Sequence, residues 1–555
     1  MARPPTQDGD EGTRGREERD HDAGVNGGGV PPAPHPDDPG PQDSDIAGPP
    51  ITPDPRALVR LSAEIHLVAQ ETRRALRGDT TIYQRGGRLV RVTTSRPPRA
   101  RWLSGAAGLP VIEEWMREPM RERISERVCF LRFDERSKRS VAAAPPGWLA
   151  DLVLDGADLD APLLDAVLPA PTLRPDGSVL DAPGYDADTG CYLAPHGLDV
   201  RVPERLDLDD ARHALGVLDE LLEDFPFEAA HDRSAVLAAI LTACVRTAIL
   251  GPCPLTLISG NAPGTGKSLL ADVVSTIALG RAAPRMAVST EDEEMRKRIT
   301  TIALAGLRLV LLDNIDSRVR GGALGGSAFD AVLTSDEWQD RVLGANRMAT
   351  LPMRTLWIAT GNNVAIRGDL LRRVVPVRLV SPIERPEERD GFAIPRLLDH
   401  VREHRSWLLT CALVAVRAWC LAGQPSQGLA PIGSFEAWSD IVRGALVWAG
   451  YADPAAGRAA LRETADPEVA GVGALLAEWH VVLGSGPLTT AQVCAHQEVD
   501  LREALVEVAS RAGAPSSRAL GYVLRAYRDR VIGGYVIRQV SDHAKARTWR
   551  VERIG

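Results

Sequence analysis

In the central part of the chain, hydrophobic residues are spaced alternately as in strands and as in helices. Four short apolar runs, at residues 255–259, 307–312, 355–360 and 374–380, have the length and composition of buried strands. Stretches with helical spacing alternate with these runs. Strands that alternate with helices predict βαβ units, so we expect an α/β core with a mainly parallel sheet over residues 211–393.

The chain ahead of this core has a different pattern. Helical spacing covers residues 58–76, and the strand-like runs 82–85 and 88–92 flank Gly86-Gly87, which supplies the positive φ angles of a two-residue hairpin turn. A second turn signal at residues 174–177 separates two further short strands. We therefore expect a small α+β domain over residues 56–210.

The chain after the core is predicted to be helical and then mixed. Residues 394–471 form the expected helical region. Residues 472–555 end in a predicted helix over 516–527 and two predicted strands, 535–538 and 548–553, around a polar loop. A helix followed by a basic hairpin is typical of a winged helix, in which the helix enters the major groove of DNA and the hairpin contacts phosphates. A plain basic surface is the alternative.

Charge is distributed unevenly along a chain of otherwise ordinary composition. The 555 residues are 44% hydrophobic and 25% charged, as in a soluble globular protein, and carry a net charge of −9. Residues 1–50 hold four arginines and eleven acidic residues, whereas residues 511–555 hold ten basic residues and three acidic ones. The basic end favours a polyanionic partner, with an ordinary solvated surface as the alternative.

Three further compositional features concern order and location. Residues 1–55 contain 12 prolines, nine glycines and no aromatic residue, which predicts disorder. The seven cysteines are scattered without a CxxC pair, so neither a disulfide framework nor a zinc site is expected. The first residues are acidic and proline-rich, where a secretory leader would be basic and then apolar, and the longest apolar run, residues 235–245, is too short for a bilayer. We expect a cytoplasmic protein with no membrane partner.

Residues 255–279 carry the strongest chemical signal. A strand-like run leads into a glycine-rich loop that ends in Lys-Ser and opens a helix, which is the context of a phosphate-binding P-loop. The backbone N–H groups of such a loop converge on phosphate oxygens, and the helix N-terminus adds a favourable dipole. The expected ATP-binding residues are Asn261, Ala262, Pro263, Gly264, Thr265, Gly266, Lys267 and Ser268.

We expect a specific role or conformation for three residues of this loop. Lys267 should reach the β- and γ-phosphates, and Ser268 should ligate Mg²⁺. The chain has only four lysines beside 61 arginines, so a lysine at the one required place is unexpected by chance. Asn261 stands where the pattern usually has its first glycine. The departure is tolerable because asparagine is the side chain best able to adopt a left-handed backbone.

Asp313 follows the second apolar run. A buried strand that ends in a carboxylate is what a second P-loop strand needs to orient Mg²⁺ through its water shell, so Asp313 and Ser268 are the expected metal residues. A core strand with an exposed aspartate at its tip is the alternative. Asn314 stands where a glutamate often activates the attacking water. Either Asp316 or Asp313 itself could take that role.

Polar residues also follow or precede the last two strands. Asn362 follows the third run, where its amide would lie beside the γ-phosphate and position water, with turn formation as the alternative. The pair Arg372-Arg373 precedes the fourth run and is expected to be a phosphate sensor or an arginine finger, with surface charge as the alternative. The candidate catalytic residues are Lys267, Asp313, Asn362, Arg372 and Arg373.

The chain resembles the AAA+-related superfamily-three helicases and the helicase halves of phage and mobile-element primases. The resemblance lies in the order of four features: the glycine-rich loop, the strand that ends in Asp, the strand that ends in Asn, and the Arg-Arg pair. Residues 333–341 and 360–363 look similar to ATPases encoded beside such primases. The resemblance covers residues 216–395. It implies that Asn362 is the sensor and that Arg372 or Arg373 is the finger. It also implies a hexameric ring around DNA that translocates with ATP hydrolysis.

The sequence thus predicts a DNA-translocating ATPase that uses Mg-ATP, a helicase or replication initiator of a phage or mobile element. The expected partners are DNA, further copies of the chain and a separate primase. An ATP-switched regulator or defence ATPase with little hydrolysis is the alternative. A primase-polymerase is a third interpretation, supported only by the acidic run 207–209 and His213, where helix capping is the simpler explanation. The expected DNA-binding residues are Arg518, Arg525, Arg528, Arg538, Arg547 and Arg550.

Overall fold

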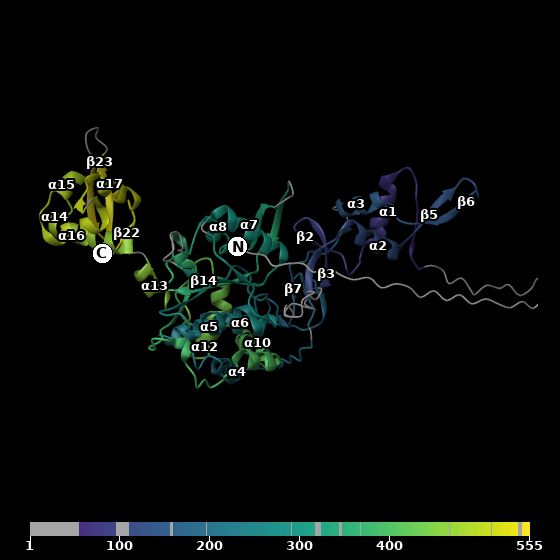
Figure 1. The fold of residues 1–555 in the computed structure, drawn as a ribbon, viewed down its shortest axis with the longest axis horizontal. Coiled ribbons are helices and arrows are strands. Elements are labelled where there is room, and N and C mark those ends of the chain that lie inside the picture. Colours follow the sequence, from purple (N-terminus) through teal and green to yellow (C-terminus); the bar gives the residue numbers. More distant parts are fainter. Residues whose placement is uncertain are drawn as a thin grey trace, which may run out of the picture. The chain divides into compact units, whose positions relative to one another are not determined.

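The computed structural model describes most of the chain from residue 55 onward (Figure 1). The described residues are 55–95, 110–155, 159–195, 197–289, 291–316, 324–342, 347–366, 368–465, 467–511, 513–541 and 547–554. The expectation of disorder over residues 1–55 concerns residues almost all of which lie outside this set. The helices and strands belong to the unit Arg56–Gly555. No described helix is both long and apolar enough to cross a bilayer.

A five-stranded parallel sheet occupies the centre of residues 211–393, which confirms the expected α/β class with a parallel sheet. Its strand order is β13-β14-β17-β12-β18. Its strands are β12 (Leu255–Gly260), β13 (Arg285–Met286), β14 (Leu309–Asp316), β17 (Leu356–Asn362) and β18 (Val374–Leu379). β14 and β17 extend beyond their predicted ends and include Asp313 and Asn362.

Helices cover both faces of this sheet. Leu309 and Leu311 of β14 join one hydrophobic cluster with residues of α5 and α6, whereas Val310 and Leu312 join a second cluster with α7 and α8. This alternation follows from the two-residue period of a strand. The helices of the core are α4 (Leu208–Glu220), α5 (Ala230–Cys244), α6 (Lys267–Leu279), α7 (Asp292–Ala305) and α8 (Ser327–Val332).

Two features interrupt the βαβ pattern of the core. A two-stranded antiparallel hairpin, β15 (Glu337–Arg341) and β16 (Met348–Pro352), lies between β14 and β17 in the sequence. A 3₁₀ helix, η3 (Gly368–Arg373), connects β17 to β18 and carries the arginine pair.

The helical region that follows the core in the sequence packs on the hydrophobic cluster that contains Leu309 and Leu311. Buried residues of α10 share that cluster with α4, α5 and α6. Its elements are η4 (Pro386–Glu388), α9 (Leu397–Glu403), α10 (Arg405–Leu421), α11 (Glu436–Trp438), the π-helix η5 (Ser439–Arg443), α12 (Gly444–Trp448) and α13 (Arg458–Ala465).

Residues 57–193 fold into short strands and three helices, α1 (Ile65–Leu76), α2 (Arg117–Arg127) and α3 (Gly147–Asp155). One sheet has the order β1-β5-β6, formed by β1 (Ala57–Arg60), β5 (Val128–Asp134) and β6 (Arg139–Ala143). A second has the order β2-β3-β4, formed by β2 (Tyr83–Arg85), β3 (Arg88–Thr94) and β4 (Pro110–Glu114). The remaining strands are β7 (Ala166–Leu168), β8 (Thr172–Leu173), β9 (Val179–Leu180), β10 (Gly184–Asp186) and β11 (Cys191–Leu193).

The predicted hairpin turn in this region is confirmed, because Gly86 and Gly87 have φ angles of 56° and 72°. The predicted helix over 58–76 is wrong in its first part. Val59 is buried and Leu58 is 66% exposed, so these residues alternate across β1, which pairs in parallel with β5. The helix begins only at Ile65. A four-residue strand is too short for its two-residue period to be separated from a helical one.

The C-terminal region has its own hydrophobic cluster, built around Trp479 and Trp549. Its helices are α14 (Pro467–Leu483), α15 (Thr490–Cys494), α16 (Val499–Ala509) and α17 (Ser517–Ala526). An antiparallel sheet has the order β19-β24-β23-β22, formed by β19 (Leu488–Thr489), β24 (Thr548–Arg553), β23 (Tyr535–Ser541) and β22 (Val531–Ile532). Two short strands, β20 (Ser510–Arg511) and β21 (Ala514–Pro515), pair ahead of α17.

Candidate functional site

The glycine-rich loop leaves the carboxyl end of β12 and leads directly into α6. Gly264 and Gly266 have φ angles of 74° and 89°, which favour glycine. Space also requires glycine here. A Cβ on Gly264 would lie 2.8 Å from the backbone nitrogen of Glu387, and a Cβ on Gly266 would lie 2.7 Å from Cε1 of Phe225. The loop therefore packs closely against Glu387 and Phe225 at its two glycines.

Lys267 is the first residue of α6 and folds back over the loop. Its Nζ donates hydrogen bonds to the carbonyl oxygen of Ala262 and to Oγ1 of Thr265, both at 2.9 Å. No carboxylate among the described residues pairs with this ammonium group. Burial lowers the pKa of Lys267. The group is thus a desolvated cation whose charge no described side chain neutralises.

Ser268 and Thr360 converge on the carboxylate of Asp313. Each hydroxyl donates a hydrogen bond of 2.7 Å to Oδ1 of Asp313. Thr360, which is buried in β17, is a site residue that we did not predict. A polar residue in an otherwise apolar buried strand was the signal for it in the sequence.

Arg285 fixes the other oxygen of Asp313. Its Nε donates to Oδ2 of Asp313 at 3.0 Å, and the same guanidinium donates to Oδ2 of Asp272 at 2.7 Å. Burial would raise the pKa of Asp313, but the hydrogen bonds from Thr360, Ser268 and Arg285 lower it overall. Asp313 is therefore held as a carboxylate with a fixed orientation.

A β-bulge changes the direction of the backbone directly after Asp313. The register between β14 and β17 shifts between Leu312 and Ile315, and Asn314 lies in the bulge with a φ of 57°. The backbone N–H of Asn314 donates to Oγ1 of Thr360 at 3.1 Å, and its side chain is exposed. The side chain of Asp316, the other candidate for activating water, lies outside the described set.

Asn261 does not adopt the left-handed backbone that we considered for it, since it is absent from the described residues with positive φ. Its side chain forms a reciprocal pair with Ser381. Nδ2 donates to the carbonyl oxygen of Ser381 at 2.9 Å, and the N–H of Ser381 donates to Oδ1 at 3.0 Å. Asparagine stands here because its amide ties the loop to the segment that follows β18.

Asn362 ends β17 beside the start of the loop. It is paired with Gly260 in the register between β17 and β12, and the N–H of Asn363 donates to the carbonyl oxygen of Gly260 at 3.2 Å. The Oδ1 atom of Asn362 is buried and has no hydrogen-bond partner. A buried amide oxygen without a partner at this edge is available to a ligand or to water.

The two arginines of η3 have different environments. Arg373 is largely buried and forms an ion pair with Asp369, with Asp330 at 4.0 Å. The side chain of Arg372 is 61% exposed, and its ion pair with Asp369 is a surface contact. Only Arg372 can therefore reach another molecule without local unfolding.

A cavity of about 470 Å³ adjoins the glycine-rich loop and was not predicted. Gly264, Thr265 and Gly266 form one wall, and apolar side chains that include Phe225, Leu269 and Ile394 form much of the rest. Arg389 also lines it, with its guanidinium 4.9 Å from the ring centroid of Phe392 and hydrogen-bonded to Asp224. These residues come from segments far apart in the sequence, so no local pattern brings them together.

The basic residues of the C-terminal region fall into two groups. Arg518, Arg525 and Arg547 line one groove of about 370 Å³ together with Tyr522, which is 58% exposed. The guanidinium of Arg525 lies 4.7 Å from the ring centroid of Tyr522. The other three predicted residues form ion pairs with Asp529 or Glu552, at 3.3 Å for Arg528, 3.1 and 3.5 Å for Arg538 and 2.5 Å for Arg550.

The acidic run at the start of α4 is accounted for by helix capping. The carboxylate of Asp207 accepts hydrogen bonds from the N–H groups of Asp209 and Asp210 at 2.9 and 3.1 Å, and the N–H of Asp207 donates to Oδ2 of Asp210 at 3.0 Å. Within the described part of the chain, no group of three or more His, Cys, Asp and Glu residues could hold a metal ion.

No protein-family model and no curated protein matches the sequence. Among solved structures, an apo structure of the NrS-1 C-terminal region is similar to this chain with a TM-score of 0.36 and 10% identity, over 79% of this chain and 98% of that one. A second apo structure, of NrS-1 residues 305–718, gives 0.40 and 10% over 85% and 96%. The JCV helicase gives 0.21 and 13% over 44% and 59%. Likeness at this level is too low to define a shared fold.

Proposed function

We propose that the carboxyl edge of the parallel sheet binds Mg-ATP and hydrolyses it. The observation that carries the proposal is the convergence of three polar groups at one loop. Lys267 lies over the glycine-rich turn without a carboxylate partner, and Ser268 is bonded to Asp313 at 2.7 Å. A glycine-rich loop at a helix N-terminus, an ammonium and a hydroxyl–carboxylate pair form the group set that a nucleoside triphosphate with Mg²⁺ requires.

Each part of the ligand has a matching group. Oγ of Ser268 and the carboxylate of Asp313 are hard oxygen donors of the kind that Mg²⁺ prefers. The loop and Lys267 would hold the phosphates, where the metal and the lysine offset negative charge during hydrolysis. The adjoining cavity is apolar near Phe225 and large enough for a purine nucleoside. The partnerless Oδ1 of Asn362 would orient water.

Binding of a fluorescent ATP analogue in the presence of Mg²⁺ tests the site. One analogue per chain should bind, and Lys267→Ala should weaken binding at least tenfold, about 1.4 kcal/mol. Lys297→Ala is the matched control, because Lys297 pairs with Glu293 on the surface of α7. Equal loss in both variants would contradict the site.

We further propose that hydrolysis requires a second copy of the chain and drives movement on DNA. The exposed Arg372 fits a finger that completes a neighbouring site, whereas the ion pairs of Arg373 suit a structural role within its own subunit. Assembly as a ring, origin in a phage or mobile element and a separate primase remain predictions.

The C-terminal region is proposed to bind the DNA. The proposal is supported by the order of α14, β19, α15–α16, α17 and the β23–β24 hairpin, with β19 paired to β24, which is similar to a winged helix. We assign the contacts to Arg518, Arg525 and Arg547, which line one groove with Tyr522. The other three arginines do not line this groove and are proposed to contribute less.

A regulator that binds ATP but hydrolyses it slowly is the second candidate. Asn314, an amide that cannot accept a proton as a base, stands directly after Asp313, and its side chain is exposed. Tight ATP binding with negligible turnover, with or without DNA, would favour this function. Turnover that DNA stimulates would favour the translocating ATPase.

A further inference from the structure

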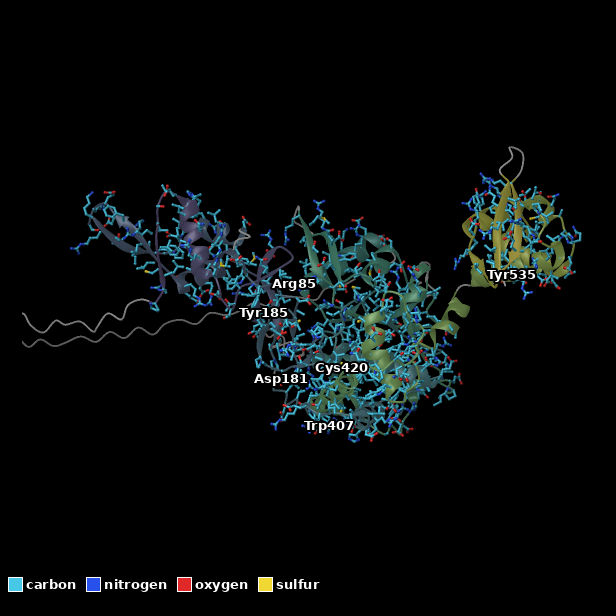
Figure 2. The ribbon with its side chains drawn as sticks, turned by 180° about the vertical axis from the view of Figure 1, so that it is seen from behind. Arg85, Asp181, Tyr185, Trp407, Cys420 and Tyr535 are labelled. Carbon is cyan, nitrogen blue, oxygen red and sulfur yellow. The ribbon has the colours of Figure 1, made fainter. Side chains whose placement is uncertain are left out.

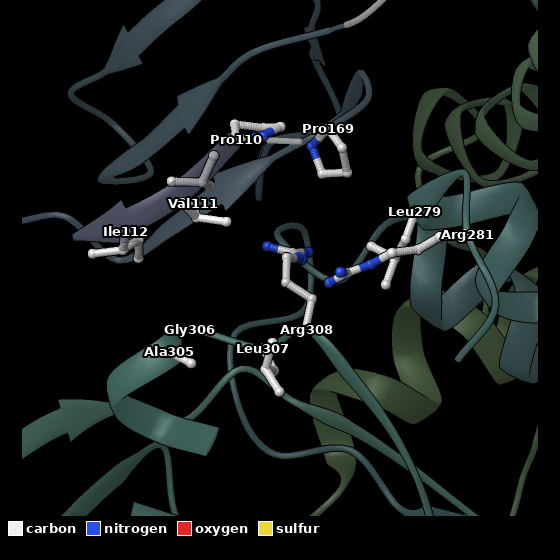
Figure 3. A pocket seen from close by; sticks show the side chains of 11 residues that line it. Pro110, Val111, Ile112, Pro169, Leu279, Arg281, Ala305, Gly306, Leu307 and Arg308 are labelled. Atoms are coloured by element: carbon white, nitrogen blue, oxygen red, sulfur yellow. The ribbon is translucent and has the colours of Figure 1, made fainter. Parts of the chain in front are cut away.

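A second cavity, of about 80 Å³, lies at the opposite edge of the parallel sheet (Figure 3). Its walls come from residues 110–112 of β4, the turn after β7, the end of α6 and residues 305–308 ahead of β14. Most of these side chains are apolar. The cavity has room for about six water molecules or for one small oxyanion.

Two arginines give this cavity a strong positive charge. The guanidinium groups of Arg281 and Arg308 both point into it (Figure 3). Neither guanidinium group makes a hydrogen bond or an ion pair with any residue in the described ranges. No acidic residue lines the cavity. Both arginines are partly buried around the cavity, and a guanidinium stays charged in proteins, so the cavity carries two positive charges.

One nearby carboxylate supplies part of the opposite charge. Asp165 acts on Arg308, and its Oδ2 pairs with Arg354 at 3.5 Å, whereas its Oδ1 is buried without a hydrogen-bond partner. Arg246 and Arg354 add positive charge near Arg308. Burial lowers the pKa of Arg281 and of Arg308, as desolvation of a cation does.

The structural tasks that these arginines could serve are performed by others. Arg405 donates to the C-terminal carbonyl oxygens of Ile277 and Ala278 in α6, at 3.1 and 3.0 Å, so Arg281 is not needed there. Arg85 (Figure 2) donates to the carbonyl oxygen of Ala303 at 2.7 Å and so ties β2 to α7. These two tasks therefore do not account for Arg281 and Arg308.

We propose that this cavity binds a terminal phosphate group. Two guanidinium forks match the charge and the oxygen geometry of a phosphate dianion. The volume fits one such group but no base or sugar, so the ligand is either inorganic phosphate or a terminal phosphate whose remainder stays outside. A phosphodiester within a strand, with a single charge and sugars on both sides, fits less well.

This site is separate from the proposed nucleotide site. Twelve residues of α6 separate Lys267 from Leu279, about 18 Å at 1.5 Å per residue. Arg308 and Asp313 are five positions apart along the chain into β14, about 16 Å. The phosphate site thus contacts the far ends of the two elements that carry Lys267, Ser268 and Asp313. Its existence does not depend on ATP hydrolysis.

Equilibrium dialysis of the full-length Lys267→Ala protein against radiolabelled inorganic phosphate tests the inference, because this background weakens binding at the glycine-rich loop. One phosphate should bind per chain. Arg281→Gln or Arg308→Gln should lower that affinity about tenfold or more. Arg201→Gln is the control, since Arg201 is 86% exposed and pairs with Asp199. Each arginine variant should unfold at or above the temperature of its parent in chloride, because it removes an unpaired cation.

Competition then separates the two sources of phosphate. A thymidine dinucleotide with a 5′-phosphate that displaces the label shows that a terminal phosphate on nucleic acid enters the cavity, whereas failure to compete restricts the site to free phosphate. Equal competition by the dinucleotide without a 5′-phosphate would contradict the inference. So would the absence of phosphate binding to the Lys267→Ala protein, or binding that both arginine variants retain in full.

Discussion

Asn261 illustrates how one side chain can replace a glycine in a tight loop. Its backbone has an ordinary φ, and its amide makes two hydrogen bonds with the backbone of Ser381. Ser381 also lines the cavity beside the loop. The amide thus connects the glycine-rich loop to a wall of the proposed nucleoside pocket.

Replacing Asn261 by glycine should therefore weaken the site even though glycine is the more usual residue. Asn261→Gly removes both hydrogen bonds and adds backbone freedom, so we expect a loss of about 1–2 kcal/mol in ATP affinity or in stability. Binding of the ATP analogue and urea unfolding would measure the two effects. Affinity and stability equal to those of the wild type would show that the Ser381 link is dispensable.

At the scale of elements, four of the five strands of the parallel sheet were predicted from the sequence, whereas β13, the β15–β16 hairpin and the details at strand ends were not. The apolar runs located β12, β14, β17 and β18 because a parallel sheet covered on both faces needs continuous apolar strands. The bulge at Asn314 was not predictable, because it depends on the hydroxyl of Thr360 in another strand. The strand β1 was missed because its partner β5 lies about 70 residues further along the chain.

A buried carboxylate clamps α2 to the segment after α1. The Asp79 side chain is 1% exposed and accepts hydrogen bonds from Arg123 at 2.8 Å and from Arg127 at 2.9 Å. Burial would raise the pKa of Asp79, but the hydrogen bonds from Arg123, Thr81 and Arg127 hold it well below its usual range.

This clamp makes stability depend on pH in acid. A lowered folded-state pKa contributes stability that is fully present above the unfolded pKa of about 4 and is lost as the pH falls toward the folded pKa. Asp79→Asn should cost about 2 kcal/mol at pH 7 in urea unfolding, and the difference from wild type should shrink from about pH 4 to pH 2. Asp199→Asn, at an exposed carboxylate, is the control. A difference that is constant with pH would rule out the clamp as its cause.

Helix α17 is expected to carry most of the DNA affinity of the C-terminal region. Arg518→Ala with Arg525→Ala should weaken binding to duplex DNA and reduce the slope of log affinity against log salt by about 0.9 for each lost phosphate contact. Arg538→Ala should change both quantities little, because Arg538 pairs with Asp529 and Glu552. Fluorescence anisotropy over a salt series provides the comparison. A larger effect of Arg538→Ala than of the α17 double variant would contradict the assignment of the DNA interface to α17.

At the scale of the whole molecule, three predicted polar residues of the candidate site lie at one edge of the sheet, whereas Thr360, Arg285 and the apolar cavity were not predicted. Lys267, Asp313 and Asn362 each follow a recognisable strand, and parallel strands bring their carboxyl ends to one edge. The cavity near Phe225 joins segments before β12 and after β18. Only the complete fold brings those segments together, so spacing along the chain could not reveal them.

The proposed trans-acting arginine predicts complementation between inactive copies. Arg372→Ala should retain ATP binding and lose hydrolysis by roughly 10³-fold, since arginine fingers contribute on that scale. Mixed with Lys267→Ala protein, it should recover part of the activity, more so at higher protein concentration because assembly follows mass action. Activity equal to the sum of the two separate variants at every concentration would argue against a shared site.

The most direct test of the central claim is the rate of ATP hydrolysis by the full-length protein, measured with and without DNA. The wild type and the Lys297→Ala control should hydrolyse ATP at similar rates, and DNA should raise both. Lys267→Ala should stay at background under both conditions, because it lacks the cation that offsets charge on the transferred phosphate. Turnover by Lys267→Ala close to that of the wild type would contradict the assignment of the glycine-rich loop as the catalytic site.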